Sequence, residues 1–297
     1  MRPLSLLLLL CLLLNSCREK TGPEGGGKAD GSEPGNVVVA TCYPMQYFTE
    51  RIAGEHLDVQ CPLPDGADPI FWQPDVASIQ QFQAADLIIS NGAQYEKWIS
   101  TVSLPESRVV DTSRSFEQDF IRYETSTTHR HGPEGDHTHT GLDGHTWLDP
   151  SNAKVQAATI RQALAKRWPD HAAEFEENLQ ALVADLDALD EAFEEVECTQ
   201  ALFASHPAYS YVAKRYGWDI TTLELDPEVL PGKDSIPAGH SAKLILWESS
   251  PRDVVSALLE KQFGIKGVIF STAGARGDED YLATMHANIA RLSAALE

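Results

Sequence analysis

Short apolar runs alternate with helical patterns in the first part of the chain. The first run is Val37-Val38-Val39-Ala40-Thr41, followed by similar runs at 57–63, 86–90 and 108–111. A short continuous apolar run is typical of a strand that is buried on both faces. Helical patterns occupy residues 45–53 and 76–84. Strands that alternate with helices predict a parallel sheet with helices on both faces.

The same alternation returns in the last hundred residues. Strands are expected at 201–205, 220–225, 242–247 and 268–271, and helices at 208–216, 252–263 and 279–295. The sequence therefore predicts a second parallel-sheet lobe.

Two longer helical patterns, at 152–168 and 170–197, lie between these regions. In the second, apolar residues are spaced alternately four and three apart, which gives one apolar stripe. These residues are Phe175, Leu179, Leu182, Leu186, Leu189, Phe193 and Val196. Such a helix would be about 40 Å long. The predicted fold class is α/β, with two parallel-sheet α/β lobes joined by a long rigid backbone helix. We place the N-terminal lobe at 37–168, the linking helix at 169–197 and the C-terminal lobe at 198–297.

The first residues have the pattern of a bacterial secretion signal. Arg2 precedes an apolar run at 4–14, and Leu14-Asn15-Ser16-Cys17 resembles a lipobox, although Asn15 is not the commonest residue at its place. In a lipobox the cysteine is acylated and becomes the new N-terminus. We expect residues 1–17 to be a lipoprotein signal peptide and residues 18–36, rich in Gly, Pro, Glu and Lys, to be a flexible tether. The protein would then be extracytoplasmic, on the periplasmic side of the cell envelope, and anchored to a membrane through lipid on Cys17.

Charge and cysteine content narrow the possible functions. The 297 residues carry a formal net charge of −21, which argues against nucleic-acid binding and is compatible with handling a cation. Beyond the signal and Cys17, only Cys42, Cys61 and Cys198 remain, so at most one disulfide can form within the chain. Cys42 and Cys61, both in predicted strands, can either pair or serve as small buried apolar residues.

Half of the ten histidines fall within residues 129–145. They are His129, His131, His137, His139 and His145. Neutral imidazole is the commonest ligand for zinc, and histidines one residue apart on a loop can converge on one ion. The alternatives to a metal-binding segment are a solvated polar loop and a remnant of a cloning tag.

Two histidines stand where parallel sheets usually place their sites. His145 begins the stretch His145-Thr146-Trp147-Leu148-Asp149-Pro150, and His206-Pro207 ends a predicted strand of the second lobe. Ligands of such sheets bind beyond the carboxyl ends of the strands. We expect His145 and His206, one from each lobe, to face each other across a shared cleft.

With these motifs the chain resembles the extracytoplasmic substrate-binding proteins of ABC importers for zinc and manganese, from about residue 37 to the end. The resemblance rests on Tyr43-Pro44, Arg51-Ile52-Ala53-Gly54, Gly66-Ala67-Asp68-Pro69, Ala85-Asp86-Leu87-Ile88, Asn91-Gly92, Glu96-Lys97-Trp98, residues 145–150, His206-Pro207-Ala208, Tyr211 and Tyr216-Gly217. It implies two lobes bridged by a long helix, a metal ion held between them and delivery to a membrane permease. It also implies that His145 is a metal ligand from the first lobe and that His206 is the ligand from the second lobe. A histidine-rich loop such as residues 129–145 is typical of the zinc-binding members of the family.

Two positions depart from the family pattern. Ile70 stands where the family has its first histidine ligand, and Ser271-Thr272 stand where it often has a final aspartate. Because zinc prefers four ligands, other side chains would have to complete the set, or the site has degenerated. Candidates for recruitment are Glu248, Asp68 and His139. Glu248 can equally be a strand-end residue that binds an Arg or the backbone, and Asp68 can cap the Pro69 turn.

The leading interpretation is a monomeric, lipid-anchored protein that captures Zn(II), with Mn(II) as the second possibility, and delivers it to an ABC importer. A second hypothesis is a member with a degenerated metal site that acts as an adhesin or binds another ligand. A third is a metallohydrolase that uses His145, His206 and a carboxylate base. The sequence has neither an H-E-x-x-H nor a G-x-S-x-G motif, which argues against an enzyme.

Overall fold

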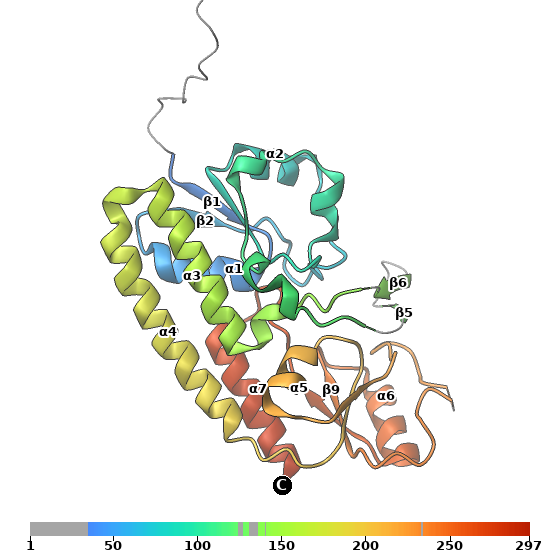
Figure 1. Cartoon of the computed structure of the whole chain (residues 1–297). Coiled ribbons are helices and arrows are strands. Elements are labelled where there is room, and N and C mark those ends of the chain that lie inside the picture. Colours follow the sequence, from blue (N-terminus) through green and yellow to red (C-terminus); the bar gives the residue numbers. More distant parts are fainter. Residues whose placement is uncertain (1–34, 124–126, 131–135, 140, 233) are drawn as a thin grey trace, which may run out of the picture. The chain divides into compact units, whose positions relative to one another are not determined.

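Two four-stranded parallel sheets form the framework of the protein (Figure 1). The computed structural model describes residues 35–123, 127–130, 136–139, 141–232 and 234–297. The expected signal peptide, Cys17, nearly all of the tether and His131 lie outside the described residues. Among the helices that the structure describes, none is long and apolar enough to cross a membrane. Cys42, Cys61 and Cys198 are free thiols.

The N-terminal sheet has the strand order β2-β1-β3-β4. Its strands are β1 Val37–Ala40, β2 Asp58–Gln60, β3 Leu87–Ser90 and β4 Val109–Asp111. Helices α1 Tyr43–Ala53 and α2 Val76–Ala84 connect them. Because side chains alternate along a strand, Val38 packs in the core cluster that includes α1, whereas Val39 packs with Phe82 of α2. The sheet is therefore covered on both faces, as the sequence predicted.

The C-terminal sheet has the order β10-β9-β7-β8. Its strands are β7 Leu202–Ala204, β8 Ile220–Thr222, β9 Leu244–Trp247 and β10 Lys266–Ile269. Its helices are α5 Ser210–Tyr216, α6 Asp253–Leu258, which continues as the π-helical turn η7 Leu259–Phe263, and α7 Tyr281–Leu296. The strands pair in parallel, so their carboxyl ends meet at one edge of the sheet.

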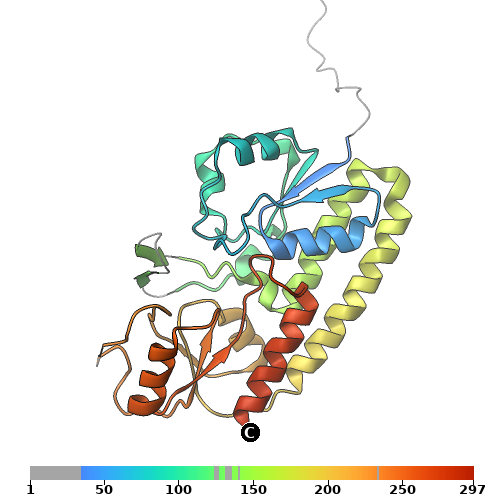
Figure 2. The same cartoon turned by 180° about the vertical axis from the view of Figure 1, so that it is seen from behind.

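A long helix runs beside elements of both lobes (Figures 1 and 2). A single 3-10 turn, η6 Pro169–His171, separates α3 Pro150–Arg167 from this helix, α4 Ala172–Glu194. The helix packs against α1 and α3 of the N-terminal lobe and against α7 of the C-terminal lobe. Its apolar stripe is buried from Phe175 to Phe193, which explains the alternating spacing of four and three in the sequence. Residues 34–297 consequently form one compact unit.

The histidine-rich segment contains a small antiparallel ribbon that the sequence analysis did not predict. Strands β5 Thr127–Arg130 and β6 Asp136–His139 pair with His129 opposite His137. An isolated bridge between Arg122 and Leu142 lies at the base of this hairpin. The remaining short elements are 3-10 helices: η1 Lys97–Thr101, η2 Glu106–Arg108, η3 Arg114–Asp119 and η5 Thr146–Leu148.

Candidate metal centre

His145 is held in place by a neighbouring buried carboxylate. Its Nδ1 lies 2.9 Å from Oδ1 of Asp143, and its backbone N–H donates to the same oxygen at 3.0 Å. Burial alone lowers the pKa of the imidazole, but the hydrogen bond and charge of Asp143 outweigh it, so the pKa of His145 is raised. A metal-binding histidine usually has its second ring nitrogen fixed by such a partner. With Nδ1 bound to Asp143, Nε2 is the nitrogen that an ion would use.

His206 and Glu248 form the counterpart in the C-terminal lobe. Both lie just beyond the carboxyl ends of neighbouring strands, β7 and β9, and Nε2 of His206 is 3.0 Å from Oε2 of Glu248. The Nδ1 of His206 lies 3.1 Å from the hydroxyl of Ser205. Thr272, beyond β10, donates its hydroxyl to the other oxygen of Glu248. The structure thus places a carboxylate beside Thr272, where the family often has an aspartate.

The pKa of Glu248 shows how strongly this carboxylate is held in its charged form. Burial raises the pKa, but the hydrogen bond and charge of His206 outweigh it and the net pKa lies well below the usual range. Among the described residues, the partners of Glu248 are thus the side chains of His206 and Thr272, not the Arg or backbone partner considered as the alternative in the sequence. That pairing does not conflict with ligation, because an ion can take the place of the direct contact between the imidazole and the carboxylate.

Asp68 approaches the same place from the N-terminal lobe. Its Oδ1 accepts the backbone N–H of Ile70 at 2.9 Å, so the expected turn cap is present. Burial, followed by repulsion from Glu248, raises the pKa of Asp68 to about 6, while His145 and His206 oppose that rise. Asp68 therefore lies within electrostatic reach of both histidines and of Glu248.

Four of the five candidate ligands are brought together. Asp68, His145, His206 and Glu248 interact electrostatically across the two lobes. In the described part of the chain, however, no group of three or more His, Cys, Asp or Glu side chains already surrounds a point that an ion could take. The donor types fit zinc or manganese, but binding would require the His206–Glu248 pair to open. The fifth candidate, His139, belongs to β6, and its side chain lies outside what the structure describes.

Ile70 borders the centre without offering a ligand. Its side chain is only 8% exposed and packs in the main apolar core. It also lines a cavity of about 20 Å³ together with His145, Tyr95, Lys97 and Tyr123. A cavity of this size holds about one water molecule. The isoleucine therefore contributes an apolar wall to the cavity beside His145 and no metal ligand.

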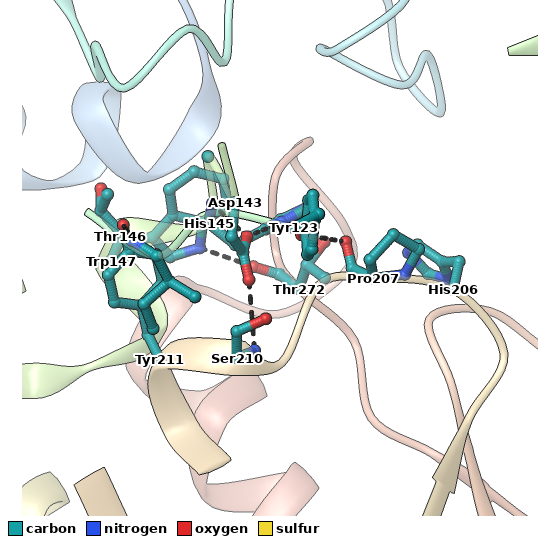
Figure 3. A network of polar contacts seen from close by, with 12 residues as sticks. Tyr123, Asp143, His145, Thr146, Trp147, His206, Pro207, Ser210, Tyr211 and Thr272 are labelled. Atoms are coloured by element: carbon teal, nitrogen blue, oxygen red, sulfur yellow. Dashed lines mark hydrogen bonds and ion pairs between the residues drawn. The ribbon is translucent and has the colours of Figure 1, made fainter. Parts of the chain in front are cut away.

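Two residues of the centre, Asp143 and Tyr123, were not found from the sequence. Asp143 and Tyr123 lie next to the histidine-rich segment, but no motif separates them from other polar loop residues. Trp147 is fully buried and donates its indole N–H to the carbonyl of Thr272 at 2.7 Å, a contact between the two lobes (Figure 3). The spacing Asp143-Gly144-His145 is the one signal in the sequence that could have indicated a carboxylate partner for the histidine.

Sequence comparison assigns the chain to a known family. Residues 38–295 match the family described as zinc-uptake complex component A, periplasmic. The zinc-binding lipoprotein AdcA of Streptococcus pneumoniae is 26% identical over 98% of this chain and 60% of AdcA. The high-affinity zinc uptake system protein ZnuA of Bacillus subtilis is 26% identical over 88% of this chain and 85% of ZnuA. This chain thus spans about 60% of the length of AdcA and most of the length of ZnuA.

Solved structures show the same fold. YcdH from Bacillus subtilis superposes with a TM-score of 0.74 at 24% identity, covering 87% of this chain and 98% of YcdH. Zn(II)-bound AdcA from Streptococcus pneumoniae superposes with a TM-score of 0.72 at 21% identity, covering 87% of this chain and 57% of AdcA. The solute-binding protein FpvC from Pseudomonas aeruginosa, in complex with Mn²⁺, superposes with a TM-score of 0.69 at 19% identity. The superposition covers 87% of this chain and 97% of FpvC.

The superpositions and the arrangement of the sheets define the class by its fold, a two-lobed α/β architecture with two parallel sheets. Within that class, the match over residues 38–295 shows that the chain belongs to the family of zinc-uptake complex component A.

Proposed function

We propose that this protein captures Zn(II), with Mn(II) as an alternative cargo, between its two lobes and delivers the ion to an ABC importer. The observation that carries the proposal is that the carboxylates of Asp68 and Glu248, one from each lobe, each lie within electrostatic range of both His145 and His206. Two imidazoles and one or two carboxylates form a donor set that suits zinc and does not exclude manganese. The relatives named for zinc binding and zinc uptake support zinc as the first choice.

The surroundings of the two histidines support reversible capture. Asp143 fixes the ring of His145, so little side-chain freedom is lost when an ion binds there. On the opposite side, His206 and Glu248 would exchange a proton for the ion. A cargo protein must also release its ion, and re-formation of the His206–Glu248 pair would favour release.

The remaining expectations from the sequence belong to the same proposal. The N-terminal signal with Cys17 would anchor the protein to a membrane on the extracytoplasmic side, and the tether at 18–36 would give the lobes at 37–168 and 198–297 reach toward a permease. We propose a monomer that binds and transfers its ion and catalyses no reaction. The histidines of the histidine-rich loop, His129, His131, His137 and His139, would gather ions loosely before transfer.

Calorimetric titration of the protein with zinc tests the proposal, with His145→Ala and His206→Ala beside the parent. His286→Ala serves as the matched control, because His286 is exposed on α7. We expect tight one-to-one binding in the parent and in the control, and loss of tight binding in the other two variants. Absence of tight binding in the parent would favour an adhesin or a different ligand, and metal-dependent hydrolysis of model esters or peptides would favour an enzyme.

A further inference from the structure

The base of the histidine-rich hairpin is a two-stranded stem that leads directly into the candidate centre. The stem consists of residues 121–123 and 141–143. The backbone N–H of Tyr123 donates to the carbonyl of Gly141 at 2.9 Å, and that of Asp143 donates to the carbonyl of Ile121 at 2.9 Å. His145 follows the stem after one residue.

The stem also binds the segment that carries the other histidine. The hydroxyl of Tyr123 donates to the carbonyl of Pro207 at 2.9 Å, directly after His206 (Figure 3). The backbone N–H of Ser210 donates to Oδ2 of Asp143 at 3.2 Å. Both contacts join the N-terminal lobe to residues that follow β7 of the C-terminal lobe.

The two carboxylate oxygens of Asp143 form hydrogen bonds with residues of different lobes. Oδ1 binds the imidazole and backbone of His145, whereas Oδ2 accepts from Ser210. The carboxylate is fully buried, so both contacts are shielded from water and each has a larger energetic effect than it would have at the surface. Tyr123 is close to the same group, since its hydroxyl interacts with both Asp143 and Ser210.

We infer that Tyr123 and Asp143 are positioning residues that hold the His206 segment at a fixed place relative to His145. Neither residue would bind the ion. Together they would set the affinity and the release rate of the ion by fixing how the two halves of the centre meet. This inference rests on the proposed function, and it assigns to the stem a role that is separate from the histidines of the hairpin.

Tyr123→Phe is the sharpest variant, because it removes one hydroxyl and keeps the ring. Tyr47→Phe is its matched control, since the hydroxyl of Tyr47 is also hydrogen-bonded, to Arg51 at 2.9 Å, but Tyr47 lies on α1 and not in the stem. Zinc affinity is measured by competition with a chelating dye, and zinc release by stopped-flow mixing with excess chelator. We expect Tyr123→Phe to weaken affinity by about tenfold, within the range known for partners of metal ligands, mainly through faster release. Tyr47→Phe should match the parent in both.

Asp143→Asn gives a second, spectroscopic readout. With Co(II) in place of zinc, we expect the visible absorption bands of this variant to shift in position and intensity, because the orientation of His145 changes. Thermal unfolding of both stem variants without metal reports any general loss of stability. The inference requires that each stem variant weakens zinc affinity more than Tyr47→Phe does.

The outcomes separate the inference from the proposed function. If the parent binds zinc tightly and Tyr123→Phe has the affinity and release rate of Tyr47→Phe, the positioning role is wrong and zinc capture stands. An Asp143→Asn spectrum identical to that of the parent counts against the role of Asp143 in the same way. If the parent itself fails to bind zinc, both the proposed function and this inference are overturned.

Discussion

His206 and Glu248 are in direct contact, with 3.0 Å between Nε2 and Oε2 at the carboxyl ends of two adjacent parallel strands. The contact brings together an imidazole and a carboxylate that lie 42 residues apart in the chain (248 − 206). It also places a negative charge where Ser271 and Thr272 offer only hydroxyls. Under the proposed function, Glu248 would therefore be the residue that compensates for the departures of this chain from the family pattern.

Glu248→Gln should weaken zinc binding at least tenfold, or about 1.4 kcal/mol, because it removes the charge while keeping the size of the side chain. The measurement is a zinc titration at neutral pH. Glu224→Gln is the control, since Glu224 is an exposed glutamate beyond β8 of the same sheet. Equal affinities in the two variants would show that Glu248 does not take part.

Ile70→His should strengthen zinc binding and favour zinc over manganese, because it adds a nitrogen donor beside His145. We expect a tenfold or larger gain in zinc affinity, together with a loss of stability from a polar ring in an apolar environment. Competition titrations with both ions measure the preference. Ile70→Leu controls for altered packing, and a gain in that variant as well would contradict the explanation.

Asp68→Asn should stabilise the metal-free protein at pH 8 and have little effect at pH 4. The folded pKa of Asp68, about 6, lies above its ordinary value of 3.8, so its ionisation opposes folding as the pH rises through that interval. One pKa unit corresponds to about 1.4 kcal/mol, and partial exposure reduces the effect, so we expect about 1 to 2 kcal/mol. Urea unfolding of the parent and of the variant at the two pH values measures this difference in the free energy of unfolding. Equal destabilisation at both pH values would indicate that the main effect of the substitution is to disturb the hydrogen bond that the backbone N–H of Ile70 donates to Asp68.

Zinc binding should release more protons at pH 6.5 than at pH 8.5. The pKa of His145 is raised by Asp143, so a larger fraction of the ring is protonated near neutral pH than in a free histidine, and the ion must displace that proton. Titrations in buffers with different ionisation enthalpies give the number of protons released. A number that is independent of pH would contradict the role of His145 as a ligand.

The apolar pattern predicted the framework because buried strands and helices leave a local signature. Helix α2 has the expected bounds, 76–84, and begins at the cap formed by Asp75. The prediction for the last strand was shifted by two residues, since β10 starts at Lys266-Gly267. Those residues lie on an edge strand, where a long charged side chain is tolerated and no apolar run marks the start.

The centre was only partly predictable, because its contacts join residues that are distant in the chain. His145 and His206 were predicted from their places near the ends of expected strands and from the family resemblance. The pairing of Asp143 with Ser210 and of Tyr123 with Pro207 depends on how the lobes meet, which no local pattern encodes. The hairpin strands β5 and β6 were missed because their polar sequence has no apolar alternation.

A crystal structure of the zinc complex, with anomalous scattering recorded at the zinc edge, tests the central claim most directly. We predict one strong peak between the lobes, with one nitrogen of His145 and one of His206 each about 2.0 to 2.1 Å away, the usual zinc–nitrogen distance. A peak bound only by the histidines of the hairpin, or by one of these two residues without the other, would contradict the account.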